Sequence, residues 1–483
     1  MNLKADFKLL AYIMLFIDAI LLIPTGMAAY YGETESLNAF IQTEVMILIF
    51  CLLIILFTRK VKILDISTKD SYIFVTLTWV IATAFGCLPL YFTGTTTSYA
   101  ESFFEIMSGF TTTGATAIPV VEDHPMSILF WRNLTNWLGG MGIVVLFVAV
   151  LPVFGVKGTA LVGAESVGPT KDKLTPQIRG TAMSLWLIYL GISAVQVILL
   201  YLGGLDLFDS LTVMFGTMGA AGFTPTNQSI ETFHSAYVEW ICIIFMFIAG
   251  GNFALYFKLL QKKLGRVFRD GEYRLYFMIV FISGMLAAMN LFANGVFGLH
   301  DSIRHAFFQI VSIITTTGFY STNYNLWPMF PQMLMFLMMF IGGCAGSTGG
   351  GIKVIRVRVL FKMGTNAMIK RNHPYAITNV RIGDDTYNTD TCLSIAGFVC
   401  FYLITALIGT VVISLSNMDF VTCLTSVMQA IGNIGIAIGG MGVTTSFHDF
   451  APPFQWVLSI LMLVGRLELF TVFSLFTKKF WTK

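Results

Sequence analysis

The sequence predicts an all-α polytopic membrane protein in which four parallel helix–pore-loop–helix repeats surround one axial pore, preceded by two N-terminal transmembrane helices. Three observations predict this fold: an apolar composition, ten apolar runs, and one short pattern that occurs four times. Of the 483 residues, 56% are hydrophobic and 11% are charged, whereas soluble globular proteins are about one quarter charged. The chain therefore lacks the polar side chains to cover a water-facing surface of this size.

The apolar runs have the length that a bilayer requires. A spanning helix needs about 20 mostly apolar residues. The second run is short, so its helix is expected to begin before residue 44. The runs cover 9–31, 44–57, 72–92, 128–154, 181–202, 237–260, 273–294, 331–361, 391–415 and 454–476.

Lysine and arginine are distributed unequally between the segments that join these runs. Cytoplasmic loops of membrane proteins carry an excess of both residues. If successive segments alternate between the two sides, all but three of the 29 lysines and arginines lie on the side that also holds both chain ends. The exceptions are Arg132, Arg304 and Arg466. The pattern predicts that both termini are cytoplasmic.

The repeated pattern lies on the opposite side and consists of an apolar helix too short to span, followed by a glycine-containing stretch. The four copies are residues 102–119, 210–227, 305–323 and 422–440. Each copy lies between two apolar runs, so each unit crosses the membrane twice and the repeats are predicted to be parallel. The expected units are 66–156, 157–262, 263–364 and 365–483, after two transmembrane helices in 1–65.

Four glycines occupy the same place in the four copies. Non-helical backbone at membrane depth is tolerated where it lines a cavity or is buried in protein, and carbonyl oxygens can replace the water around a cation. Close helix packing would explain one such glycine, but four favour a selectivity filter. The candidate cation-binding residues are Thr112, Thr113 and Gly114; Ala220, Ala221 and Gly222; Thr316, Thr317 and Gly318; and Asn433, Ile434 and Gly435.

Acidic residues lie near the outer start of each short helix pattern. Such a helix would point the partially negative end of its dipole at the pore. The acidic side chains would either draw cations toward the pore or act as helix N-caps, and both roles stay open. They are Glu101, Asp206, Asp209, Asp301 and Asp419.

The run 331–361 contains a glycine-rich segment, residues 342–351, which has six glycines. Each glycine costs up to about 1 kcal/mol in a helix, so the segment is expected to interrupt the helix and to gate the pore from the cytoplasmic side. A phosphate-binding loop is the competing interpretation, but the GxxxxGK[ST] pattern is not present. The candidate gating glycines are Gly342, Gly343, Gly346, Gly349, Gly350 and Gly351.

Arg466 lies midway along the last apolar run, where a charge is costly and usually functional. Two interpretations are open: a structural pair with an acid such as Glu468, or a positive charge beside the pore axis that holds the glycine-rich segment closed or limits cation passage. Lys353 follows that segment and is interpreted as a residue that extends its charge to the cytoplasmic interface.

Several of these motifs resemble the Trk/Ktr/HKT superfamily of potassium transporters, most closely its bacterial TrkH/TrkG branch. They are TTTGAT at 111–116, TTTGF at 315–319, GGCAGSTGGGIKVIR at 342–356 and GRLE at 465–468. The family's fourth filter segment usually reads close to N-x-G-P-G-L-G. This chain differs there, with Ile436 and Ala437 in place of proline and glycine.

The resemblance implies potassium uptake across the bacterial inner membrane, with K⁺ as the transported ion and no organic cofactor. It also implies a homodimer in membrane lipid, one pore per protomer, and a cytoplasmic nucleotide-binding ring of TrkA type as partner. The filter residues, the gating loop and Arg466 carry over onto the positions named above. No nucleic-acid partner is expected.

Two other classes of function compete with a gated pore. An ion-coupled (Na⁺ or H⁺) symporter would need an ionisable relay, for which the candidates are Asp18, Glu44, Glu239, Arg466 and Glu468. A membrane enzyme is not expected, because the sequence has no HExxH motif and suggests no nucleophile–base pair. The seven cysteines are scattered and suggest neither a disulfide framework nor a zinc site.

Overall fold

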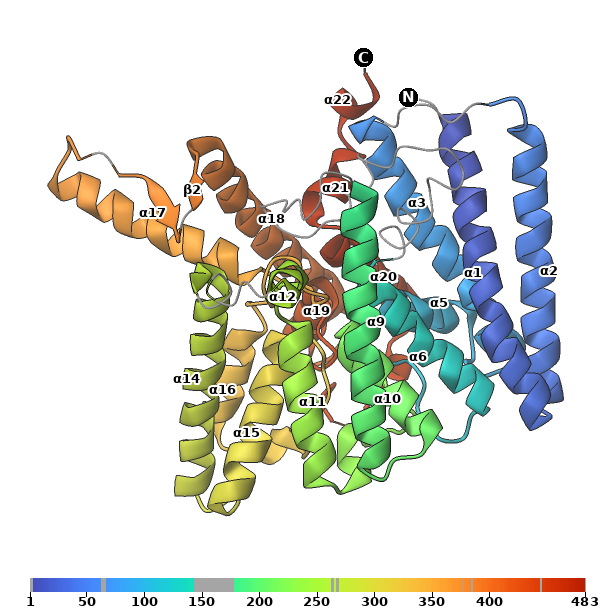
Figure 1. Ribbon diagram of the computed structural model, residues 1–483, viewed down its shortest axis with the longest axis horizontal. Helices are drawn as coiled ribbons and strands as arrows, with labels where there is room; N and C mark the ends of the chain where they lie inside the picture. The colour runs from blue at the N-terminus through green and yellow to red at the C-terminus, as the bar shows by residue number, and fades with distance from the viewer. Residues whose placement is uncertain are drawn as a thin grey trace.

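The computed structural model describes residues 3–61, 67–142, 178–261, 265, 269–376, 378–383, 385–443 and 445–482. Within these ranges the chain forms a helical bundle in which α1 begins at the end of the molecule where α22 lies (Figure 1). Part of the expected span 128–154, and the expected boundary between the first two units at 156, fall outside the described residues.

Six helices of the described part are long and apolar enough to cross a membrane, which makes the chain a multi-pass membrane protein. The second starts at Thr34, ten residues before the apolar run, as its shortness predicts. The helix α3 continues into α4 (Leu88–Phe92) as one span, Lys69–Phe92. The six are α1 (Leu3–Tyr31), α2 (Thr34–Phe57), α3 (Thr68–Gly86), α9 (Ile178–Leu202), α14 (Gly271–Ala293) and α18 (Thr389–Ile413).

Four shorter helices coincide with the repeated pattern of the sequence. Most of their residues are buried, which fits helices that lie inside the bundle and not at its surface. Each packs against the long helix before it and the helix after it. They are α5 (Tyr99–Phe110), α10 (Leu207–Gly219), α15 (Leu299–Ile314) and α19 (Phe420–Gly432).

The helices that follow the short ones are interrupted. The expected span 237–260 is bent, because α11 (Ala236–Ala249) and α12 (Phe253–Leu260) meet at 95°. The expected span 454–476 is also broken, between α20 (Pro452–Arg466) and α21 (Leu469–Ser474). With the bent pair counted as one, the described part holds seven candidate spans, and part of the ten expected runs lies outside the described residues.

The physical cause of the first break is a set of hydrogen bonds made outside the helix. The side chain of Asn252 caps α12 by accepting from Ala254 N at 2.8 Å. The carbonyls of Ala249 and Gly250, at the end of α11, accept from the segment 342–351 instead of continuing the helix. The break thus depends on a contact about 100 residues away, which a local apolar pattern does not reveal.

The remaining elements lie mainly at the ends of the bundle. The helix α17 (Val354–Asn372) projects from the bundle together with the antiparallel hairpin of β1 (Val380–Ile382) and β2 (Asp385–Tyr387) (Figure 1). Short elements complete the described chain. They are α6 (Met126–Gly140), α16 (Met329–Met338), α22 (Lys478–Trp481), and the 3-10 turns Ser229–Phe233, Tyr324–Leu326, Ser414–Ser416 and Phe447–Asp449.

Contacts between the short helices and their neighbours close a ring. The helix α6 packs on α10, α11 packs on α15, and α20 packs on α5, so the last unit returns to the first. Helices α17 and α18 connect the third and fourth units. One continuous apolar core runs through these contacts, and the C-terminal ends of the four short helices face it.

Candidate cation pathway

The chain after each short helix takes the same local backbone conformation. A non-glycine residue with positive φ follows each helix, which is uncommon in proteins. The next residue donates its N–H to the carbonyl five residues back, at 2.8–3.0 Å. The positive-φ residues are Thr112 (57°), Ala220 (54°), Thr316 (62°) and Asn433 (51°).

The four glycines that follow lie against one another, although 108 or more residues separate the first from any other. A Cβ atom placed on Gly114 would lie 1.5 Å from the carbonyl oxygen of Ala221, and one on Gly222 would lie 2.2 Å from that of Thr317. A Cβ on Gly318 would lie 2.0 Å from Cα of Gly435. Each segment thus contacts the next at backbone distance, and no larger residue fits without displacing a neighbour.

All the candidate filter residues beside these glycines are buried. Hydroxyl pairs link Thr111 to Thr113 at 2.9 Å and Thr315 to Thr317 at 2.8 Å. The amide of Asn433 donates to the hydroxyl of Thr113 at 3.0 Å, which connects the fourth segment to the first. The threonine hydroxyls and the Asn433 amide are therefore hydrogen-bonded within and between the segments.

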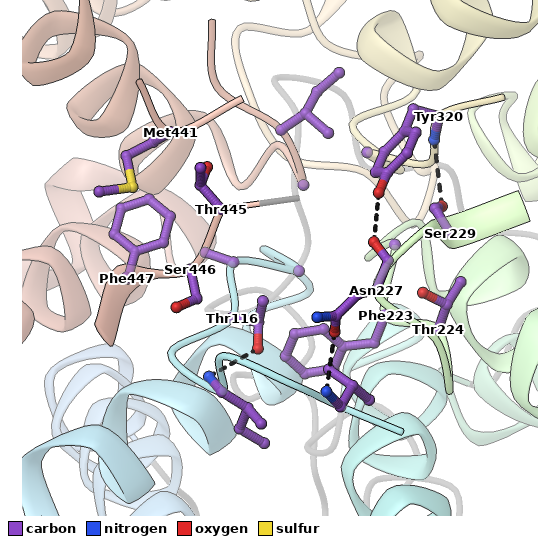
Figure 2. A pocket seen from close by; sticks show the side chains of 18 of the residues that line it. Thr116, Phe223, Thr224, Asn227, Ser229, Tyr320, Met441, Thr445, Ser446 and Phe447 are labelled. Atoms are coloured by element: carbon purple, nitrogen blue, oxygen red, sulfur yellow. Dashed lines mark hydrogen bonds between the residues drawn. The ribbon is translucent and has the colours of Figure 1, made fainter. Parts of the chain in front are cut away.

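A cavity of about 80 Å³ opens beside the four glycines on the side of the loops that follow them. It is lined by all four glycines together with residues from each loop. Figure 2 shows Asn227 and Tyr320 from neighbouring loops joined across it by the bond from the Tyr320 hydroxyl to the Asn227 carbonyl. Thr116 and Phe447 line the opposite side.

The fourth segment departs from the other three. Gly114, Gly222 and Gly318 have φ between 76° and 85°, whereas Gly435 does not have a positive φ. The side chain of Gln429 donates to the Gly435 carbonyl at 3.0 Å, and the Tyr324 hydroxyl donates to the Ala437 carbonyl at 2.7 Å. Side-chain hydrogen bonds thus hold this segment where the sequence lacks the family's proline and second glycine.

A buried ion pair behind the first two segments was not identified from the sequence. Arg132 lies 2.5 Å from Glu105, with 2% and 0% of their side chains exposed. The only signal was that Arg132 lies outside the basic cytoplasmic loops. A second pair, Arg304 with Glu239 at 2.8 Å, lies beside the third short helix.

The five acidic residues near the helix starts have different roles. Asp206 and Asp419 are N-caps that accept backbone N–H groups of the first turn. The cap of α5 is Ser98 instead, and the Glu101 carboxylate accepts from Thr97 N at 2.7 Å. The N-cap hypothesis is therefore right for two of the five and wrong for Glu101, Asp209 and Asp301, since Gly298 begins α15.

The glycine-rich segment interrupts the helix between α16 and α17, as expected. A backbone bridge between Ile341 and Ile352 joins the residues that flank the segment on either side. Its tip contacts the inner ends of the third and fourth segments: Gly350 N donates to the Thr316 hydroxyl at 2.9 Å. A Cβ on Gly349 would lie 2.6 Å from the Thr315 carbonyl oxygen. The segment therefore covers these two filter segments on the side away from the cavity.

Polar side chains hold this loop in place. Lys353 is fully buried and donates to the Gly349 carbonyl at 2.5 Å and to Ser347 Oγ at 3.2 Å. The interpretation of Lys353 as an interfacial residue is therefore wrong, because the loop folds back over its ammonium group. Glu272, which the sequence did not single out, accepts from Ala345 N at 2.8 Å and Ile355 N at 3.0 Å.

Arg466 connects the loop to the first segment. Its guanidinium donates to the Thr348 carbonyl at 2.8 Å and to the Thr112 hydroxyl at 3.2 Å. It also donates to the carbonyls of Gly139 and Gly140, where α6 ends. The Glu468 carboxylate accepts from Arg356 at 2.6 Å. Of the two interpretations of Arg466, the contact with the glycine-rich loop is the one that these bonds support.

Comparison with known proteins gives consistent matches over nearly the whole chain. The TrkH family profile, described as "Cation transport protein", matches residues 37–483. The chain is 34% identical over 485 residues to the Trk system potassium uptake protein TrkH of Escherichia coli K12, with all of both chains covered. It is 38% identical over 424 residues to TrkH of Halomonas elongata, with 87% of each covered. The crystal structure of the potassium transporter TrkH from Vibrio parahaemolyticus superposes with a TM-score of 0.88 at 30% identity, covering both chains completely.

Proposed function

The chain belongs to the TrkH family of cation transport proteins, and from this premise we propose that it takes up potassium across the bacterial inner membrane through a gated pore. The relatives named above are potassium uptake proteins. The observation that carries the proposal is the meeting of four segments at Gly114, Gly222, Gly318 and Gly435, each preceded two residues earlier by a non-glycine residue with positive φ. The proposed activity is transport, which requires no catalytic residues.

The proposed filter works through backbone oxygens. A potassium ion entering from the cavity would exchange its water for carbonyls of the four segments. The four short helices end at these segments, and their C-terminal dipoles favour a cation there. Close packing of the segments fixes the spacing of the oxygens, and the hydrogen bonds of Gln429 and Tyr324 support the fourth segment. The units 66–156, 157–262, 263–364 and 365–483 are the proposed repeats.

The loop 342–351 is the proposed gate, and the contacts of Arg466, Lys353 and Glu272 correspond to a closed state. Conduction requires the loop to move, which breaks the bonds from Arg466 to the Thr348 carbonyl and from Gly350 N to the Thr316 hydroxyl. A homodimer with a cytoplasmic ring of TrkA type is the proposed assembly, with both termini on the cytoplasmic side. Movement of the ring would be transmitted to the loop through α17, which continues directly from it.

An ion-coupled symporter is the alternative mechanism. Among its candidate relay residues, Glu239 pairs with Arg304 and Glu468 pairs with Arg356. Asp18 and Glu44 lie on α1 and α2, which stand at the edge of the bundle (Figure 1). These positions favour a passive pore, because a relay has to lie along the ion's path. Uptake driven by a potassium gradient alone, without sodium or a pH difference, would exclude obligatory coupling.

The direct test is rubidium-tracer uptake into proteoliposomes that hold the purified protein. Gly318→Ala should abolish uptake, since its Cβ would meet Gly435 at 2.0 Å. Gly191→Ala is the matched control, because nothing lies within 4 Å of a Cβ there. Potassium should compete with the tracer and sodium should compete poorly. Unchanged uptake by Gly318→Ala would refute the filter, and equal competition by both ions would refute potassium as the specific cargo.

A further inference from the structure

A second cavity, of about 550 Å³, lies where the start of α14 meets α17 (Figure 1). It is separate from the four segments, and no residue of the candidate filter lines it. Three arginines line it: Arg269 and Arg274 near the start of α14, and Arg358 on α17. Among the described residues that line this cavity, none is acidic.

The nearby acids are committed elsewhere. Asp270 caps α14 by accepting from Tyr273 N at 2.8 Å. Glu272 lies on the other side of the helix, where it accepts from Ala345 N within the glycine-rich loop and from Ile355 N in the first turn of α17. Among the described residues that line the cavity, no carboxylate cancels its positive charge, and an anion is the complementary occupant.

The apolar part of the cavity follows the same helix away from the arginines. Met278 and Ile279 lie four and five residues beyond Arg274, which at 1.5 Å per residue is about 6–8 Å along α14. With Phe361, which is 75% exposed, they form an apolar wall. The helix α14 is a candidate span, and Met278 and Ile279 lie further along it than Arg274. The cavity is charged at the helix end and apolar toward the middle of the span.

We propose that this cavity binds an anionic phospholipid, with the phosphate on the three arginines and an acyl chain along Met278, Ile279 and Phe361. Basic pockets between transmembrane helices on the cytoplasmic side are suited to acidic head groups. A free phosphate would satisfy the arginines but would leave the apolar wall uncovered, so the amphipathic ligand fits both halves. The arginines lie on the side that carries the basic loops of the sequence.

The site is connected to the proposed gate by two adjacent residues. The Arg358 guanidinium donates to the Gly271 carbonyl, and the next residue, Glu272, accepts from Ala345 N within the loop and from Ile355 N in the first turn of α17. A lipid that ties Arg358 to Arg274 would stabilise the α14–α17 junction and with it the loop. This regulatory step rests on the proposed function, whereas the lipid site itself does not.

The test is native mass spectrometry of the purified protein after exchange into phosphatidylglycerol or phosphatidylcholine. The variant is Arg269→Gln/Arg274→Gln, since both side chains are exposed and their loss should leave the fold intact. The matched control is Lys370→Gln/Arg371→Gln, which removes two exposed charges from the last turn of α17. The wild type and the control should retain phosphatidylglycerol, and the variant should bind it about thirtyfold more weakly, as expected for the loss of two arginine–phosphate contacts.

Three outcomes would overturn the proposal. They are equal retention of phosphatidylcholine, displacement of the lipid by sn-glycerol 3-phosphate at matched concentration, and a change of oligomeric state in the variant without loss of lipid. The second would assign the arginines to a free phosphate, and the third to contact with another copy. Because lipid retention is read without transport, a failed potassium assay and a failed lipid site are distinguishable.

Discussion

Arg132 lies 2.5 Å from Glu105 inside the protein, and this pair connects two of the four glycine-centred segments. Glu105 accepts from the Thr116 hydroxyl at 2.9 Å and from Ala117 N at 2.6 Å, just after Gly114. Arg132 donates to the Thr224 carbonyl at 3.0 Å, two residues after Gly222. The guanidinium also lies 3.6 Å from the centre of the Phe223 ring. One ion pair thus fixes the outer ends of the first and second segments.

Removing one partner of this pair should destabilise the protein more than removing both. Arg132→Leu leaves the Glu105 carboxylate buried without its cation, for which we expect a loss of about 3–5 kcal/mol. Arg132→Leu combined with Glu105→Leu should recover part of that loss, since no charge remains buried. Denaturation of the detergent-solubilised protein measures both, with Arg371→Leu as the exposed control. Additive effects of the two single changes would contradict the coupling.

Tyr324→Phe tests the support of the fourth segment. The change removes the hydroxyl that donates to the Ala437 carbonyl, which should cost about 1 kcal/mol. The expected result is a lower ratio of rubidium to sodium uptake with the fold retained, because the segment gains freedom where proline and glycine are missing. Tyr30→Phe, at an 84% exposed position, should change neither. A variant that keeps the wild-type ratio would show that this hydrogen bond has no part in selectivity.

The sequence predicts the parts of this fold that depend on local pattern. The apolar periods place α5, α10, α15 and α19, and the density of glycine predicts the break at 342–351. The break after Ala249 is not predictable in this way, because its carbonyls are taken by a loop far along the chain. The same reason explains the error at Lys353, whose burial depends on how the loop folds back. Whether a charged residue such as Glu105 is paired depends on which side chain the fold brings beside it, here Arg132.

Arg466→Gln should open the pathway. The arginine donates charge-assisted bonds to Thr348 and to the carbonyls where α6 ends, each worth about 1.5–3 kcal/mol. Loss of about 1.4 kcal/mol from the closed state shifts the equilibrium tenfold, so basal rubidium uptake should rise by about that factor or more. The readout is uptake by proteoliposomes without added partner. Arg371→Gln serves as the control for loss of a cytoplasmic charge, and lower uptake by Arg466→Gln would assign the residue to the ion path instead.

Lys353→Met separates the loop from the arginine. Methionine is close in length and apolar, so it fills the buried site but cannot donate to the Gly349 carbonyl. The loop then loses the hydrogen bond from Lys353 but keeps the one from Arg466. Basal uptake should therefore rise less than in Arg466→Gln. The double variant should exceed either single one, because the two side chains hold different carbonyls, Gly349 and Thr348. Uptake at the wild-type level in Lys353→Met would mean that the loop is held by its backbone contacts alone.

Asp419 gives a prediction that depends on pH. Hydrogen bonds from the hydroxyl and N–H of Thr422 lower the pKa of the Asp419 carboxyl below its ordinary value of 3.8. A carboxyl with a lowered folded-state pKa contributes stability above the unfolded pKa and loses it as the pH falls through the folded one. Asp419→Asn keeps a cap but no charge, so it should be less stable than the wild type at pH 6. That difference should shrink as the pH falls through the unfolded pKa and vanish below the lower, folded-state pKa. Asp419→Ala removes the cap, at about 1 kcal/mol, and should remain less stable than Asp419→Asn at both pH values.

A wild-type advantage over Asp419→Asn that persists in acid would show that the cap acts through geometry and not through charge.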